Sequence, residues 1–94
     1  MRVLRWAVAI DDNTHELRFN GPVVPGAEAC HDGCPTVAFW SVEPDSNPDA
    51  RITRVMRVFG TGQPIPDGWV WRATTPRLGG LVWHVCEFVG LGKG

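Results

Sequence analysis

The feature that most constrains this chain is its division into short segments in which apolar and polar residues alternate at every second position. Turn-forming Gly, Pro, Asn and Asp recur about every 8 to 15 residues, so no element can be long. A two-residue period is typical of β-strands, whose successive side chains point to opposite faces. The pattern predicts an all-β domain, a small antiparallel meander that forms a sandwich or a partly open barrel. We expect about six or seven strands and at most one short helix.

The first two predicted strands flank the turn cluster 11–13 and are expected to pair as a hairpin. The third and fourth strands form a second predicted hairpin, with its turn at His31-Asp32-Gly33, because Asp-Gly is a strong turn signal. Two strands, 36–43 and 81–89, are apolar on both faces and are therefore expected in the middle of the sheet. The predicted strands are residues 2–10, 14–19, 27–30, 36–43, 51–59, 69–75 and 81–89.

Segment 51–59 is ambiguous, because its apolar residues also fit a helical stripe. It is rich in β-branched residues and lacks Ala, Leu, Glu and Lys, which favours a strand. The segments between the strands contain Gly, Pro, Asn and Asp and are predicted to be irregular. The predicted organisation is one β domain over residues 1–89 with a flexible tail at 90–94, and irregular segments at 44–50, 60–68 and 76–80.

Charge and cysteine content exclude several classes of protein. A formal net charge of −1 gives no long-range attraction to nucleic acid or an anionic membrane. No apolar run approaches the roughly 20 residues of a membrane span, and the apolar stretch at the start is too short for a signal peptide. Three cysteines are an odd number, which argues against a disulfide framework. We therefore expect a cytoplasmic protein without membrane contact.

A zinc site is one hypothesis for the cysteines and histidines. Cys30, His31 and Cys34 surround one turn, and His84 and Cys86 lie two residues apart on a later strand. The spacing argues against a zinc site, since Cys34 follows Cys30 after three residues and precedes a proline. His84 and Cys86 alternate with Trp83 and Val85 in an apolar strand, where a cysteine commonly serves as a small hydrophobe. We rank zinc last among the functions considered, with Cys30, Cys34, His84 and Cys86 as its ligands.

No residue pattern indicates catalysis. Ser41 has no Gly-x-Ser-x-Gly turn around it, and adjacent Asp11 and Asp12 would point apart on a strand. Gly60-Thr61-Gly62 lacks the Lys and the helix of a phosphate-binding loop, so it predicts a tight turn. We expect no enzymatic activity and no cofactor.

Arginine and tryptophan gather in the second half of the chain, in the combination found at protein–protein hot spots. The candidate protein-binding residues are Trp69, Trp71, Arg72, Arg54 and Arg57. The same side chains, with Arg51 and Arg77, suit an alternative function as a single-stranded nucleic-acid binder that stacks bases on tryptophan. The neutral net charge disfavours that alternative. Exposed edge strands also permit a homodimer.

The motifs Gly-Thr-Gly-Gln-Pro-Ile at 60–65 and Gly-Gly-Leu-Val-Trp-His-Val-Cys-Glu at 79–87 resemble those of a family of small, uncharacterised phage and prophage proteins. Eight Arg against one Lys indicate GC-rich codons, in keeping with an actinobacterial host. The family provides no reaction, cofactor or catalytic residue to transfer. The resemblance implies a phage-encoded accessory protein made in the bacterial cytoplasm. With the arginine and tryptophan content, it leads us to expect non-catalytic binding to a host or phage protein, in a host-takeover or growth-interference role.

Overall fold

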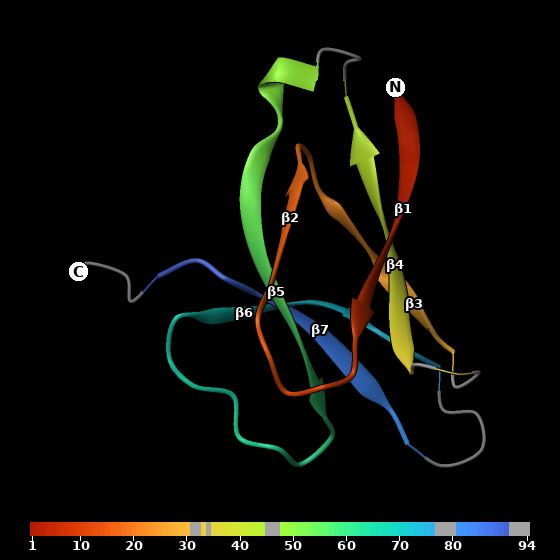
Figure 1. Ribbon diagram of the computed structural model, residues 1–94, viewed down its shortest axis with the longest axis vertical. Helices are drawn as coiled ribbons and strands as arrows, with labels where there is room; N and C mark the ends of the chain where they lie inside the picture. Colours follow the sequence, from red (N-terminus) through yellow and green to blue (C-terminus); the bar gives the residue numbers. More distant parts are fainter. Residues whose placement is uncertain (31–32, 34, 45–47, 77–80, 91–94) are drawn as a thin grey trace.

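Seven strands and one 3-10 turn make up the regular structure of the residues that the computed structural model describes, 1–30, 33, 35–44, 48–76 and 81–90 (Figure 1). This confirms the predicted all-β class and the predicted number of strands. Among these residues no helix has the length and apolarity that crossing a membrane would require. The elements are β1 (Arg2–Ala9), β2 (His15–Phe19), β3 (Val23–Cys30), β4 (Thr36–Glu43), η1 (Pro48–Ala50), β5 (Ile52–Gly60), β6 (Trp69–Thr74) and β7 (Trp83–Phe88).

The strands form one sheet in the order β1-β4-β3-β6-β7-β5-β2. Every neighbouring pair is antiparallel except β3 and β6, which are parallel and pair through Gly26 and Thr74 alone. The sheet curls into a nearly closed, barrel-like shape in which β1 and β2 are the two edges (Figure 1). The expectation of a partly open barrel is therefore confirmed. The ambiguous segment 51–59 forms a strand, as its β-branched residues predicted, although β5 begins at Ile52 and ends at Gly60.

The predicted hairpin between residues 2–10 and 14–19 is wrong. β1 pairs along its whole length with β4, whereas β2 pairs with β5 on the other edge of the sheet. The end of β1 is held on the β4 side, because the Ile10 N–H donates to the Pro35 carbonyl at 3.0 Å. Alternation identifies a strand and its buried face, but it does not identify the partner strand.

The second predicted hairpin is confirmed as β3–β4, and β4 lies between β1 and β3 as its two apolar faces predicted. β3 begins at Val23 rather than at residue 27, because Pro25 and Gly26 weaken its strand pattern. Several predicted features lie outside the described residues: His31 and Asp32 of the first turn, Cys34, residues 45–47, residues 77–80 of the second turn, and tail residues 91–94.

The core fills the inside of the curled sheet. Phe19 and Phe39 are completely buried with ring centroids 6.0 Å apart, and Trp6 covers Phe19 at 5.4 Å. Such aromatic pairs stabilise a small domain beyond the area they bury. Nine residues, with at least one from each of the seven strands, form this cluster, namely Val8, Phe19, Ala27, Val37, Phe39, Met56, Val58, Ala73 and Val85.

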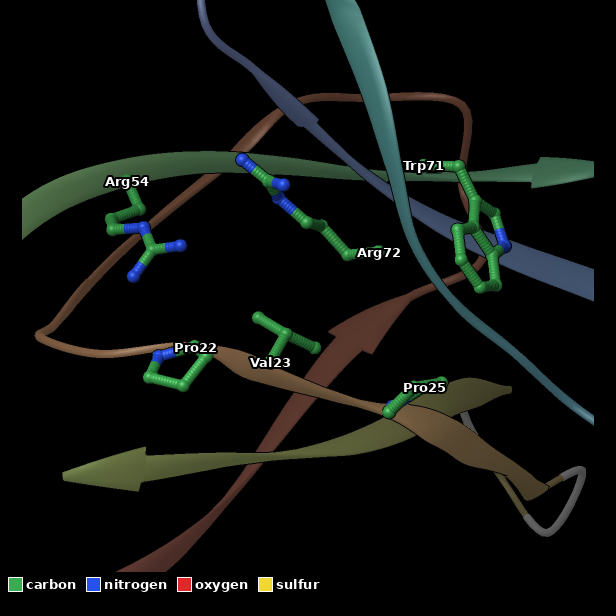
Figure 2. Close-up of a pocket in the computed structure, with 6 residues that line it drawn as sticks. All are labelled: Pro22, Val23, Pro25, Arg54, Trp71 and Arg72. Atoms are coloured by element: carbon green, nitrogen blue, oxygen red, sulfur yellow. The ribbon is translucent and has the colours of Figure 1, made fainter.

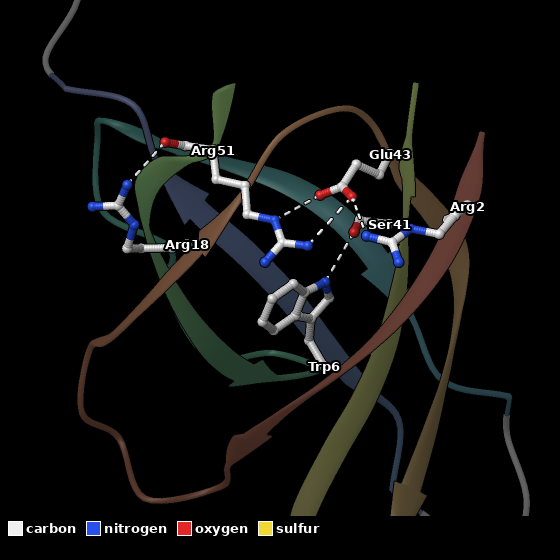
Figure 3. A network of polar contacts seen from close by, with 6 residues as sticks. All are labelled: Arg2, Trp6, Arg18, Ser41, Glu43 and Arg51. Atoms are coloured by element: carbon white, nitrogen blue, oxygen red, sulfur yellow. Dashed lines mark hydrogen bonds and ion pairs between the residues drawn. The ribbon is translucent and has the colours of Figure 1, made fainter. Parts of the chain in front are cut away.

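A buried carboxylate links strands on both sides of the barrel opening (Figure 3). Glu43 of β4 accepts hydrogen bonds from the Arg51 Nε at 2.7 Å and from the Arg2 Nη2 at 3.1 Å. The Arg51 carbonyl in turn accepts a hydrogen bond from Arg18 of β2 at 3.2 Å. The hydrogen bond from Arg51 lowers the pKa of Glu43, against the opposing effect of burial, and Arg2 adds to the lowering.

We predict that acid destabilises the fold partly through Glu43. Its pKa is lowered by folding from 4.5, so its stabilisation is present above that pH and is lost as the pH falls through the folded value. Glu43→Gln should lower the thermal midpoint at pH 7 and flatten its dependence between pH 7 and pH 3. Thermal melts followed by circular dichroism test this, with the exposed Glu16→Gln as control. Equal pH dependence in wild type and Glu43→Gln would contradict it.

Candidate functional site

The site begins with an irregularity in β3. Opposite β4, Val23 pairs with Ser41 and the next paired residue is Ala27 with Phe39, so four steps on β3 match two on β4. Two extra residues in one strand are a bulge, which bends the strand and interrupts its pairing. Pro25 lies inside the bulge and has no backbone N–H to donate to either neighbour. This part of β3 therefore cannot continue a regular ladder with β6.

Where the pairing stops, β3 and β6 leave a pocket of about 360 Å³ between them (Figure 2). Figure 2 shows Pro22, Val23 and Pro25 on one side, Arg54 and Arg72 facing them, and Trp71 at one end. The volume falls in the lower part of the range of ligand pockets, roughly 300 to 1,000 Å³. We call this pocket the β3–β6 slot; its lining is Pro22, Val23, Pro25, Arg54, Trp71 and Arg72.

Two guanidinium groups and one carboxylate set the charge of the slot. Glu87 of β7 accepts two hydrogen bonds from Arg54, at 2.7 and 2.8 Å, and one from the Arg72 Nε at 2.9 Å. Arg54 also donates to the Gly21 carbonyl at 2.8 Å and lies over the Phe19 ring at 4.0 Å. Burial raises the pKa of Glu87, but the hydrogen bonds from Arg54 and Arg72 outweigh it and lower that pKa. Two positive charges against one negative charge leave the group at +1.

Trp71 is half exposed, at 51%, yet its ring is fixed by a hydrogen bond. The indole Nε1 donates to the Thr74 Oγ1 at 2.6 Å, and that hydroxyl lies 2.9 Å from the His84 Nδ1. The other nitrogen of the His84 imidazole, Nε2, lies 2.8 Å from the Thr61 Oγ1. The Thr61 hydroxyl donates to the Val82 carbonyl. A Thr61 hydroxyl that donates to a carbonyl must accept from the Nε2–H, so Nδ1 accepts from Thr74. The chain of bonds assigns one neutral tautomer to His84.

A second apolar cluster lies on the outer face of β5, β6 and β7, apart from the main core. Phe59 is completely buried there, with Trp69 edge-on at 5.6 Å, and Trp69 in turn contacts Phe88 at 5.4 Å. The Arg57 guanidinium lies 4.5 Å from the Phe59 ring centroid. Trp69 therefore stabilises the fold here, although it is only two positions from exposed Trp71.

The structure brings together three of the five predicted binding residues. Arg54, Trp71 and Arg72 line the slot, whereas Trp69 and Arg57 belong to the outer apolar cluster. Sequence analysis missed the β3 wall of the slot and Glu87. The two prolines at 22 and 25 were the available signal, because proline inside a strand predicts a break in pairing.

The arginines do not form one basic strip. Arg54 and Arg57 are three residues apart on β5 and so point to opposite faces. Arg51, Arg54, Arg57 and Arg72 each pair with an acidic side chain, and Arg77 lies outside the described residues. This distribution does not resemble a continuous track for a nucleic-acid backbone.

The candidate zinc ligands that the structure describes lie in separate environments and do not face one common point. Cys30 is exposed at the end of β3, while Cys86 is completely buried on β7. Both ring nitrogens of His84 lie within hydrogen-bond distance of threonine hydroxyls. Among the residues the structure describes, no three His, Cys, Asp or Glu side chains are grouped as metal ligands would be.

The Gly60-Thr61-Gly62 segment is the predicted tight turn. Gly62 has a φ of 91°, a conformation that favours glycine, and the Thr61 N–H donates to the Val82 carbonyl at 3.2 Å. The turn therefore holds Thr61 against His84.

We predict that Cys86 is unreactive in the folded protein. Burial raises its pKa to about 11, so the thiolate is scarce at pH 8. Iodoacetamide at pH 8, followed by peptide mass spectrometry, should modify exposed Cys30 and leave Cys86 unmodified until denaturant is added. Equal modification of both thiols in the native protein would refute this.

We also predict that the neutral imidazole of His84 carries its proton on Nε2 and that its partner Thr74 orders the Trp71 ring. Long-range ¹H–¹⁵N spectra of the imidazole report the tautomer directly. Thr74→Val should move the Trp71 indole N–H resonance, whereas Thr53→Val, at an exposed site on β5, should not. An Nδ1–H tautomer, or an unmoved Trp71 resonance, would contradict the proposed direction of the hydrogen bonds.

Comparison with known proteins identifies a family but no characterised relative. No curated protein and no solved structure matches the chain. One family model, described as a domain of unknown function, DUF7352, matches residues 1–90. That match includes every strand of the barrel and all six residues that line the slot. The chain therefore belongs to the DUF7352 family.

Proposed function

We propose that this protein is a non-catalytic binding domain that docks onto another protein at the β3–β6 slot. The observation that carries the proposal is the half-exposed Trp71, whose ring is held in place beside the slot. A rigid aromatic ring beside arginine is the usual composition of an interface hot spot. An interface of ordinary size needs only about 800 Å² on each partner.

The two strands that border the slot carry further exposed apolar residues. Val24 and Val70 are also exposed, Val24 inside the bulge of β3 and Val70 next to Trp71 on β6. Arg72 is one-third exposed and adds a charged contact beside these apolar groups. Apolar anchors beside one arginine favour a protein partner over nucleic acid, which needs a row of positive charges.

The biological setting follows from the resemblance in the 60–65 and 79–87 motifs. It supports a phage-encoded accessory protein, made in the bacterial cytoplasm, that occupies the surface of a host or phage protein. Such binding interferes with a host process without any chemistry of its own. Pairing of the β1 or β2 edges in a homodimer remains a separate prediction, because neither edge contributes to the slot.

The proposal predicts that Trp71→Ala abolishes capture of the partner. Tagged wild-type protein and Trp71→Ala, each incubated with lysate of the bacterial host, are compared by quantitative mass spectrometry. Truncating a hot-spot tryptophan costs at least about 2 kcal/mol of binding free energy, or about 30-fold in affinity. Val3→Ala, at an exposed apolar residue on β1, is the matched control. A partner retained equally by Trp71→Ala and wild type would refute docking at the slot.

A further inference from the structure

The edge of β6 that faces the slot carries unpaired backbone groups. The Val89 N–H donates to the Gly68 carbonyl at 2.8 Å, which fixes the hydrogen-bonding phase of the β6–β7 ladder. Residues of an antiparallel ladder alternate between bonding to the partner strand and pointing away from it. Trp71 pairs with Cys86 at the last position before the β6–β7 register shifts between Trp71 and Ala73, and the phase set at Gly68 directs its N–H and C=O away from β7, toward β3. β3 does not pair with them, because its only bridge to β6 is Gly26 with Thr74.

Arg72 also presents unused hydrogen-bond donors to the slot. Arg54 uses all three of its guanidinium nitrogens, two on Glu87 and one on the Gly21 carbonyl. Arg72 uses only its Nε on Glu87, and among the described residues its two terminal amino groups have no hydrogen-bond partner. These amino groups and the net charge of +1 suit one further carboxylate, which would bring the group to neutrality. A phosphate, at about −2, would leave an excess of negative charge.

The walls of the slot suit an apolar side chain next to that carboxylate. Pro22, Val23 and Pro25 present carbon atoms on the β3 side, and the Trp71 ring closes one end (Figure 2). A ligand that meets the free β6 edge, the Arg72 amino groups and these walls together is an extended peptide. Addition of a strand to an open sheet edge is a common mode of peptide recognition.

We propose that the β3–β6 slot binds an extended acidic segment of the partner protein. One carboxylate of the segment pairs with the terminal amino groups of Arg72, and its backbone hydrogen-bonds to the N–H and C=O of Trp71. A neighbouring apolar side chain packs between Pro25 and the Trp71 ring. This proposal rests on the proposed function, since it specifies the chemistry of the partner at the same site.

Two synthetic peptides test the proposal on the full chain. The probe is acetyl-Ser-Thr-Val-Glu-Val-Thr-Ser-amide, and its twin carries Gln in place of Glu. Titration of ¹⁵N-labelled protein should move the backbone and indole N–H resonances of Trp71 and the Nε–H resonance of Arg72. The Glu peptide should bind at least about tenfold more tightly than the Gln peptide, because a hydrogen bond between charged groups is the stronger one. Equal binding of the two peptides would overturn the proposal, as would no binding.

Three variants separate recognition from folding. Arg72→Gln should remove the preference for the Glu peptide, and Arg57→Gln, on the outer face, should keep it. Glu87→Gln frees donors on Arg54 and Arg72 and raises the charge of the slot, so it should tighten binding of the Glu peptide several-fold. If Glu87 only stabilises the fold, Glu87→Gln should not bind the Glu peptide more tightly than wild type does. Circular dichroism and thermal melts establish that each variant is folded before it is titrated.

Two further comparisons distinguish the alternatives. If N-acetylglutamate amide alone binds as tightly as the Glu peptide, the slot takes a small carboxylate and the peptide proposal is wrong. If Trp71→Ala loses the partner but Arg72→Gln keeps it, the proposed function stands and the acidic-segment proposal fails. If the Glu peptide binds with the expected preference but Trp71→Ala keeps the partner, the slot is an acidic-peptide site and the docking proposal fails.

Discussion

Pro25 cannot donate a backbone hydrogen bond, and it lies in the one stretch of β3 where the ladder with β4 gains two extra residues. Because the bulge interrupts β3, its parallel pairing with β6 is limited to Gly26 and Thr74. The sheet therefore has one weakly paired seam, between β3 and β6, in addition to its open edges at β1 and β2. The slot, its unpaired β6 edge and its proline wall all depend on this interruption.

Charge reinforces the strands beside the interruption. β5 and β6 each pair with β7, and Glu87 adds a link across all three strands by accepting hydrogen bonds from Arg54 and Arg72. Glu43 has the same role near the barrel opening, between Arg2 and Arg51. The two carboxylates differ in what they leave available. Glu87 leaves the terminal amino groups of Arg72 unused, so an acidic ligand can add to the network without breaking it.

Alternation along the chain predicted the seven strands, because burial of every second side chain is a local pattern, but it missed the first four residues of β3. It did not predict the partners: β1 and β2 follow each other in sequence and lie at opposite edges of the sheet. Trp69 and Trp71 share a face and a residue type, yet Phe59 and Phe88 contact only Trp69. That difference depends on residues ten or more positions away, which no local pattern contains. Likewise Arg54 and Glu87 are 33 residues apart, so their pairing follows only from the strand order.

Native-state hydrogen exchange at two neighbouring amides tests most directly whether β6 is open toward β3. The alternation of the β6–β7 ladder places the Val70 N–H in a hydrogen bond to β7 and leaves the Trp71 N–H facing the slot. We expect the Trp71 amide to exchange at least about tenfold faster than the Val70 amide under native conditions. Equal protection of the two amides would mean that β3 and β6 pair continuously, and that the slot does not exist in solution.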